Sequence, residues 1–417
     1  MFKTEQQYTI RAHDNEFGHR RSFTMYVKSP DQGINEQTGV LLVVQNLLAQ
    51  ANSSFWQGLR AKWADAYNVV CIGLNYQGAG WTGRAGSGEY AIPIDTIKQM
   101  CGLLPEEIRP KEVPTDAGEF LKYFIGWDLT RYGIEFTETQ NLEFWKNYPD
   151  YGFIQAIDCL WALGALKQIC GEKQVSLNWK RTYAYGLNEG GHIVQMCGRF
   201  APNTFALIVD NSGYPYITLN TMTGGEVFRE IRRLPAGDSY INVFVSIPKT
   251  YGLWENARYY VTEDMVEIRD LRRFIVESPT RYVVIQAEGD NPDKQVVCEM
   301  MRGRGLSVEY AVEEDAVDEH SVASLFENYA DRYLAPDSSE MLLTEGVADF
   351  ELGTRITFST TNGQFVLDYS SGAPMIEFEG EIIALRLAKE EPISEGYGTG
   401  LAIEGKDYYW RRQQLDV

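Results

Sequence analysis

The sequence has few of the residues that bind metals, and it has few positive charges. Four histidines and six cysteines are scattered over 417 residues, and no cysteine pair has the C-x-x-C spacing. We therefore expect no metal site and no cofactor. Lysine and arginine total 38 against 58 acidic residues, which gives a formal net charge of −20. Nucleic acids and anionic membranes need a positive surface, so neither is an expected partner.

Long apolar runs are also missing. No stretch approaches the roughly 20 apolar residues that cross a bilayer. The polar start, residues 1–7, does not resemble a secretory signal. Several cysteines lie in apolar runs, as buried free thiols do. These features predict a cytoplasmic protein without a membrane span.

What the chain does have is enough apolar sequence for a large core. Hydrophobic residues make up 44% and aromatic residues 13%. The first 30 residues predict a two-stranded hairpin, and helical stretches separate most of the apolar runs that follow. Such alternation predicts a mostly parallel sheet with helices on both faces, an α/β fold. The predicted strands are 39–45, 68–74, 181–185, 205–210, 281–287 and 306–312, and of these 39–45, 68–74 and 205–210 are expected to be buried.

Two irregular segments and a change of pattern divide the chain. Residues 75–149 and 211–280 interrupt the alternation, and we interpret them as insertions in a domain that covers 1–335. Pro336 begins a short linker. Beyond it, apolar and polar residues alternate as in exposed β-strands, so 340–417 is predicted as a small C-terminal all-β domain.

The segment "GLNEG", 186–190, has the frame of a nucleophile elbow, G-x-S-x-G, with asparagine in place of serine. It lies between a predicted strand and a predicted helix, which is the context that the motif requires. The elbow holds its central residue at positive φ. Asparagine tolerates positive φ better than most residues, so Asn188 can occupy this position.

Acidic and histidine candidates follow later strands in a fixed order. Asp290 and Asp293 come after strand 281–287, and His320 comes after strand 306–312. The order nucleophile position, aspartate, histidine is that of α/β-hydrolase triads. Asp293 is the first choice for the acid and Asp290 is the alternative.

Residues 1–334 resemble the α/β-hydrolase superfamily. The run from "NYPDYGFIQAIDCLWAL" to "YAYGLNEGGHIVQMCGRFAPNTFALIVDNS" is similar to a bacterial group of unknown function that usually has serine at the position of Asn188. The resemblance implies an eight-stranded sheet with insertions after the fourth and sixth strands. It also implies an oxyanion hole from the backbone N–H of Glu189 and one near Asn46 or Leu47.

Each candidate also has a purely structural interpretation. Asp293 opens a helix and could serve only as its N-cap. His320 could be a surface residue at a helix start. The Glu189 side chain is expected to be incidental, and His192, on the helix after the elbow, is expected to pack or cap.

Asparagine changes the chemistry that the site supports. Its amide nitrogen is a poor nucleophile, so covalent acyl transfer is not expected. The first hypothesis is a pseudo-hydrolase that binds a small acyl or ester ligand, or a protein, without catalysis. The second is an active carboxylesterase-like enzyme, in which His320 activates water or Asn188 replaces a native serine. The third is an assembly subunit that forms homo-oligomers through its C-terminal β domain.

Overall fold

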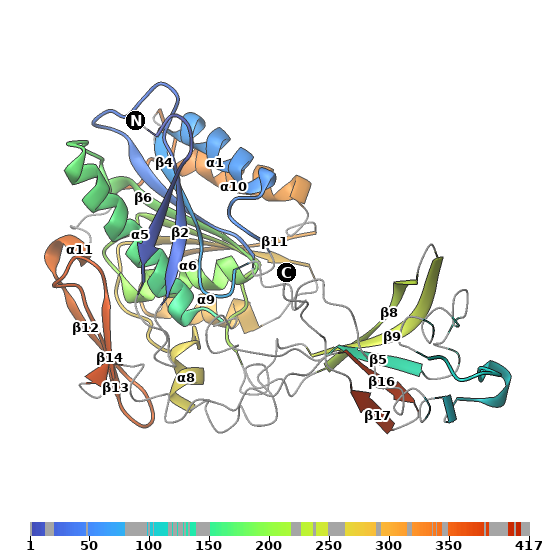
Figure 1. Ribbon diagram of the computed structural model, residues 1–417. Coiled ribbons are helices and arrows are strands. Elements are labelled where there is room, and N and C mark those ends of the chain that lie inside the picture. The colour runs from blue at the N-terminus through green and yellow to red at the C-terminus, as the bar shows by residue number, and fades with distance from the viewer. Residues whose placement is uncertain are drawn as a thin grey trace. The chain divides into compact units, whose positions relative to one another are not determined.

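The structure is a computed structural model, and the protein divides into two compact units (Figure 1). The first unit comprises Met1–Trp81, Lys146–Ile217 and Thr262–Lys389, and the second comprises Thr82–Trp145, Thr218–Val261 and Glu390–Val417. Apart from a few short pieces, the structure describes residues 2–12, 21–46, 49–79, 104–115, 134–138, 151–217, 227–236, 239–248, 263–288, 293–314, 319–335, 349–378, 399–403 and 406–409.

An eight-stranded sheet forms the centre of the first unit. Its strand order is β1-β2-β4-β3-β6-β7-β10-β11. The first two strands form the predicted hairpin, β2 pairs antiparallel with β4, and the pairs from β4 to β11 are parallel. The bounds are β1 (Gln6–Arg11), β2 (Ser22–Lys28), β3 (Gly39–Val44), β4 (Val69–Asn75), β6 (Thr182–Leu187), β7 (Leu207–Asn211), β10 (Arg281–Ala287) and β11 (Ser307–Glu313).

Helices cover both faces of this sheet, as continuous apolar strands such as β3 and β6 require. On one face α1 (Ser54–Tyr67) packs beside α10 (Glu319–Tyr333), with the Trp63 and Phe326 ring centroids 4.2 Å apart. On the other face α5 (Phe153–Glu172) packs against α6 (Glu189–Phe200). The predicted mostly parallel sheet with helices on both faces is therefore confirmed.

Helix α5 is long and apolar enough to cross a membrane. We expected no such stretch from the sequence and did not identify it there. Most of its apolar window is buried inside the protein, as in the core helix of a globular unit. The six cysteines are free thiols, and all are buried.

The segment that follows α10 contributes to two different sheets. One is a four-stranded antiparallel sheet within the first unit, which packs on the end of α6 through the rings of Phe358 and Phe365 against Phe200. The Tyr369 hydroxyl donates to the Phe200 carbonyl at 2.9 Å. This part comprises α11 (Asp349–Leu352), β12 (Arg355–Ser359), β13 (Gln364–Asp368), β14 (Met375–Phe378) and β15 (Glu381–Ile382).

The second unit contains a five-stranded sheet of order β17-β16-β5-β9-β8. It draws strands from both predicted insertions and from the C-terminal segment, so the region predicted as one β domain, 340–417, supplies strands to both units. The bounds are β5 (Ile134–Glu138), β8 (Val227–Ala236), β9 (Ser239–Pro248), β16 (Thr399–Ile403) and β17 (Lys406–Tyr409).

Candidate active site

The turn between β6 and α6 holds Asn188 in a strained conformation. Its backbone has φ 51° and ψ −116°, a region that residues other than glycine rarely occupy. The Asn188 N–H donates to the Asn211 carbonyl at 2.7 Å, and its carbonyl accepts from the Gly191 N–H at 2.8 Å. Hydrogen bonds at both ends of the residue therefore maintain the strain.

The two elbow glycines are required by close backbone packing. A Cβ atom on Gly186 would overlap the carbonyl of Gly190, and a Cβ atom on Gly190 would overlap the carbonyl of Val44. The missing side chain of Gly186 therefore lets the turn close on itself, and that of Gly190 lets it lie against the end of β3.

The elbow exposes one side chain selectively. Of residues 181–200, all of which the structure describes, Asn188 is the one that is not buried. Its side chain makes no capping hydrogen bond to α6. Two features identify the fold. One is the strand order with its antiparallel first pairs, and the other is this sharp strand-to-helix turn. The fold is that of the α/β-hydrolases.

Comparisons with known proteins give one match to a family of sequences and several matches to solved structures. Residues 134–325 match a family described as "Protein of unknown function (DUF2920)". No curated protein matches the chain in sequence at a significant level. Among solved structures, acylaminoacyl peptidase from Pyrococcus horikoshii matches with a TM-score of 0.44 and 10% identity over 81% of this chain, which spans 42% of the peptidase.

Two esterases match at similar levels. A lipase/esterase from Lactobacillus plantarum has a TM-score of 0.42 and 12% identity, over 79% of this chain and 97% of its own. Brefeldin A esterase, a bacterial homologue of human hormone-sensitive lipase, has a TM-score of 0.42 and 11% identity. The match covers 78% of this chain and 75% of the esterase.

The other candidate triad residues follow strands of the same α/β-hydrolase sheet. Asp293 is the first residue of α9 (Asp293–Gly303), which follows β10, and its Oδ2 accepts a 2.7 Å hydrogen bond from the Tyr216 hydroxyl. His320 lies in the first turn of α10, after β11, and its side chain is outside the described residues, as is all of Asp290. Because β6, β10 and β11 are parallel, Asn188, Asp293 and His320 follow strand ends at one edge of the sheet. Convergence of the three side chains stays a prediction.

The predicted oxyanion donors flank the elbow. Glu189 is the first residue of α6, where backbone N–H groups lack partners within the helix. Asn46, two residues beyond β3, is partly exposed, and Leu47 lies outside the described residues. The contact of Gly190 with the carbonyls of Val44 and Gln45 brings the start of α6 next to this segment.

The Glu189 carboxylate, expected to be incidental, is buried beside two tyrosines. Glu189 is 4% exposed. Burial raises the pKa of Tyr214 well above its usual value, and the neighbouring Glu189 carboxylate raises it further. Tyr76, whose hydroxyl donates to the Gln45 carbonyl at 2.8 Å, has its pKa raised by the same two causes. Sequence reasoning missed this cluster because nothing in the local pattern marks Glu189 as buried.

A buried ion pair links β7 to the start of α9. The Lys294 ammonium contacts the Asp210 carboxylate, and both side chains are fully buried. The same carboxylate accepts from Gln195 Nε2 of α6 at 2.9 Å and from the Gly213 N–H at 2.8 Å. Lys294 adjoins Asp293, so this network fixes the position of the candidate acid relative to α6.

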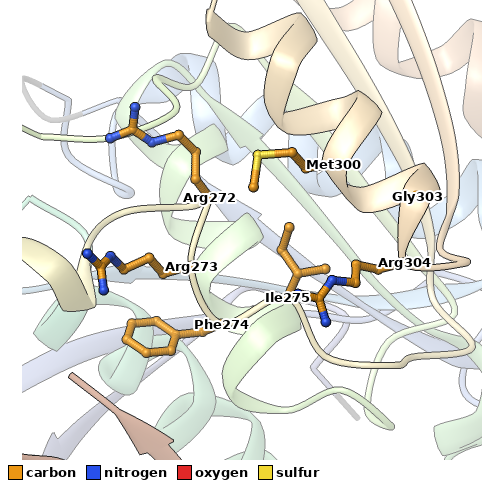
Figure 2. Close-up of a pocket in the computed structure, with 7 residues that line it drawn as sticks. All are labelled: Arg272, Arg273, Phe274, Ile275, Met300, Gly303 and Arg304. Carbon is orange, nitrogen blue, oxygen red and sulfur yellow. The ribbon is translucent and has the colours of Figure 1, made fainter. Parts of the chain in front are cut away.

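A hollow of 440 Å³ lies elsewhere on the first unit (Figure 2). Ile275 and Met300 point into the space between the loop and α9, whereas the guanidinium groups of Arg272 and Arg273 extend away from Met300. Arg272 pairs with Asp270 at 2.8 Å, and Arg273 pairs with Glu267 at 3.3 Å. The hollow adjoins the C-terminal end of α9, opposite the end that begins at Asp293, so it is separate from the elbow.

His192, one helical turn after Asn188, packs in the core as expected. It is fully buried, its Nδ1 lies 2.8 Å from the Tyr214 carbonyl, and its ring packs against the Tyr214 ring at a tilt of 30°. Burial lowers the pKa of His192 to about 3, although the Tyr214 hydrogen bond opposes the shift. The charges of Lys294, Arg199 and Arg269 lower it slightly more.

This lowered pKa predicts a loss of stability in acid. The unfolded protein binds a proton at His192 near pH 6.5, whereas the folded protein does not until near pH 3. The contribution of His192 to the free energy of unfolding should therefore be fully present above pH 6.5. Between pH 6.5 and pH 4 it should fall by about 3 kcal/mol. Urea unfolding across this range should show a shallower pH slope for His192→Asn, which keeps a donor near Nδ1 but does not titrate. Equal slopes in the two proteins would contradict this assignment.

Proposed function

We propose that this protein is a pseudo-hydrolase that binds a small acyl or ester ligand at the elbow and does not catalyse acyl transfer. The supporting observation is the conformation of Asn188, which has φ 51° and ψ −116°. Of residues 181–200, Asn188 is the one that is not buried in the core. On this proposal, the turn between β6 and α6 is a nucleophile elbow that carries an amide where the chemistry needs an oxygen or sulfur nucleophile.

The amide suits binding better than attack. Its nitrogen lone pair is delocalised into the carbonyl, so it does not add to an ester carbon at neutral pH. The same group carries both hydrogen-bond donors and an acceptor, and it can bind the carbonyl or hydroxyl of a ligand. Backbone N–H groups at the start of α6 would bind an ester carbonyl oxygen from the other side.

The test is turnover by the unmodified protein. With p-nitrophenyl esters of short acids, we expect a hydrolysis rate close to that of buffer, because no attacking group is present. His320→Ala should leave this rate unchanged. Turnover well above buffer that His320→Ala abolishes would show that a histidine-activated water does the chemistry, and it would contradict the proposal.

A further inference from the structure

The elbow positions Asn188 for a reaction with its own backbone. We propose that Asn188 is a deamidation site, at which the folded protein converts the side-chain amide to a carboxylate through a succinimide ring. The inference rests on the backbone geometry at Asn188 and does not require that the site bind a ligand.

Ring closure needs a particular backbone angle. The ring contains the backbone nitrogen of Glu189 and the carbonyl carbon, Cα, Cβ and Cγ of Asn188, and it is nearly flat. The nitrogen must therefore eclipse Cβ around the bond from Cα to the carbonyl carbon. The angle ψ is measured about this bond from the residue's own nitrogen. In an L-residue Cβ lies about 120° from that nitrogen around the same bond, so the next nitrogen eclipses Cβ at ψ of about −120°. Asn188 has ψ −116°.

Ordinary backbone conformations do not meet this condition. Helical and extended residues have ψ of about −42° and +135°, which turn the next nitrogen far from Cβ. An unfolded protein rarely visits the required region, because it is strained for any residue with a side chain. Here the hydrogen bonds of Asn188 to Asn211 and Gly191, together with the packing of the elbow glycines, maintain it.

The side chain is also accessible to the reaction. It is partly exposed to solvent, and no capping hydrogen bond to α6 holds its amide. A solvent base can remove the proton from the backbone N–H, and water can reach the ring that forms.

The two steps balance without any further reagent. In the first, the deprotonated Glu189 nitrogen bonds to Asn188 Cγ, the Cγ–Nδ2 bond of the amide breaks, and ammonia leaves with a proton from the solvent. In the second, water adds at Cγ and the new bond between Cγ and the Glu189 nitrogen breaks, which restores the original backbone and leaves aspartate. Opening at the other carbonyl would lengthen the backbone by one carbon and give isoaspartate, which has the same mass as aspartate. The product carries a carboxylate, which is a competent nucleophile, at the nucleophile position.

Peptide mapping by mass spectrometry tests the proposal on the unmodified, full-length protein. During incubation in neutral buffer, the peptide that contains Asn188 should gain about 1 Da. Because the fold orients the reacting atoms, the gain should appear at least about tenfold faster in folded protein than in urea-unfolded protein. In ¹⁸O-labelled water the product should carry the heavy oxygen, and hydroxylamine should cleave the backbone between residues 188 and 189 by trapping the ring.

The same digest contains an internal control. Asn68 also has a positive φ, 49°, but its ψ of 58° places the next nitrogen opposite Cβ. It should not gain mass in the folded protein. Asn188→Gln would need a six-membered ring and should end both the mass gain and the hydroxylamine cleavage. A rate at Asn188 that is no faster in folded than in unfolded protein would overturn the proposal, whatever the protein's hydrolytic activity.

Discussion

Asn188→Ser should give the protein ester-hydrolysing activity, with a rate on short acyl esters roughly two or more orders of magnitude above the unmodified protein. The elbow glycines, the strained backbone at position 188 and the N–H groups at the start of α6 are already in place. Serine is smaller than asparagine and fits the same φ and ψ. On the proposed function, the attacking oxygen is the component that is missing.

Two further variants separate the mechanism from incidental effects. Asn188→Ala removes the amide without adding an oxygen, so its rate should stay at the level of the unmodified protein. Adding His320→Ala to Asn188→Ser should remove the gain, since a serine hydroxyl needs a general base. If Asn188→Ser stays folded by circular dichroism but shows no gain over a broad ester panel, the site is not a preorganised hydrolase site.

Lys294→Met should lower the free energy of unfolding by about 3 to 5 kcal/mol, because it leaves a charged Asp210 without its buried partner. Urea denaturation at pH 7 measures the loss. The double variant Lys294→Met/Asp210→Asn should lose less than Lys294→Met alone, since no unpaired charge stays in the core. A single variant within about 1 kcal/mol of the unmodified protein would show that the pair contributes little to holding α9 against β7.

The elbow could be predicted from sequence because its determinants are local. Two glycines at fixed spacing, a preceding apolar strand and a following helix lie within residues 182–200, and the structure has them there. The helix predicted at 320–334 is likewise observed at Glu319–Tyr333, because its apolar spacing and its end are encoded in adjacent residues.

The features that sequence reasoning missed depend on distant segments. The five-stranded sheet pairs β5 with β9 and with β16, which lie far apart in the sequence, and no local pattern specifies such partners. The alternation of apolar and charged residues in "VFREIRRL" was the available signal for β8. The burial of Glu189 depends on Tyr76 and Tyr214, which follow other strands.

The central claim is that position 188 is a nucleophile position that lacks only its nucleophile. A fluorophosphonate probe, which reacts covalently with activated serines, tests this most directly when its attachment site is mapped by mass spectrometry. We expect no labelling of the unmodified protein and labelling of Asn188→Ser at position 188 alone. Labelling of the unmodified protein at any of its own serines, or no labelling of a folded Asn188→Ser variant, would contradict it.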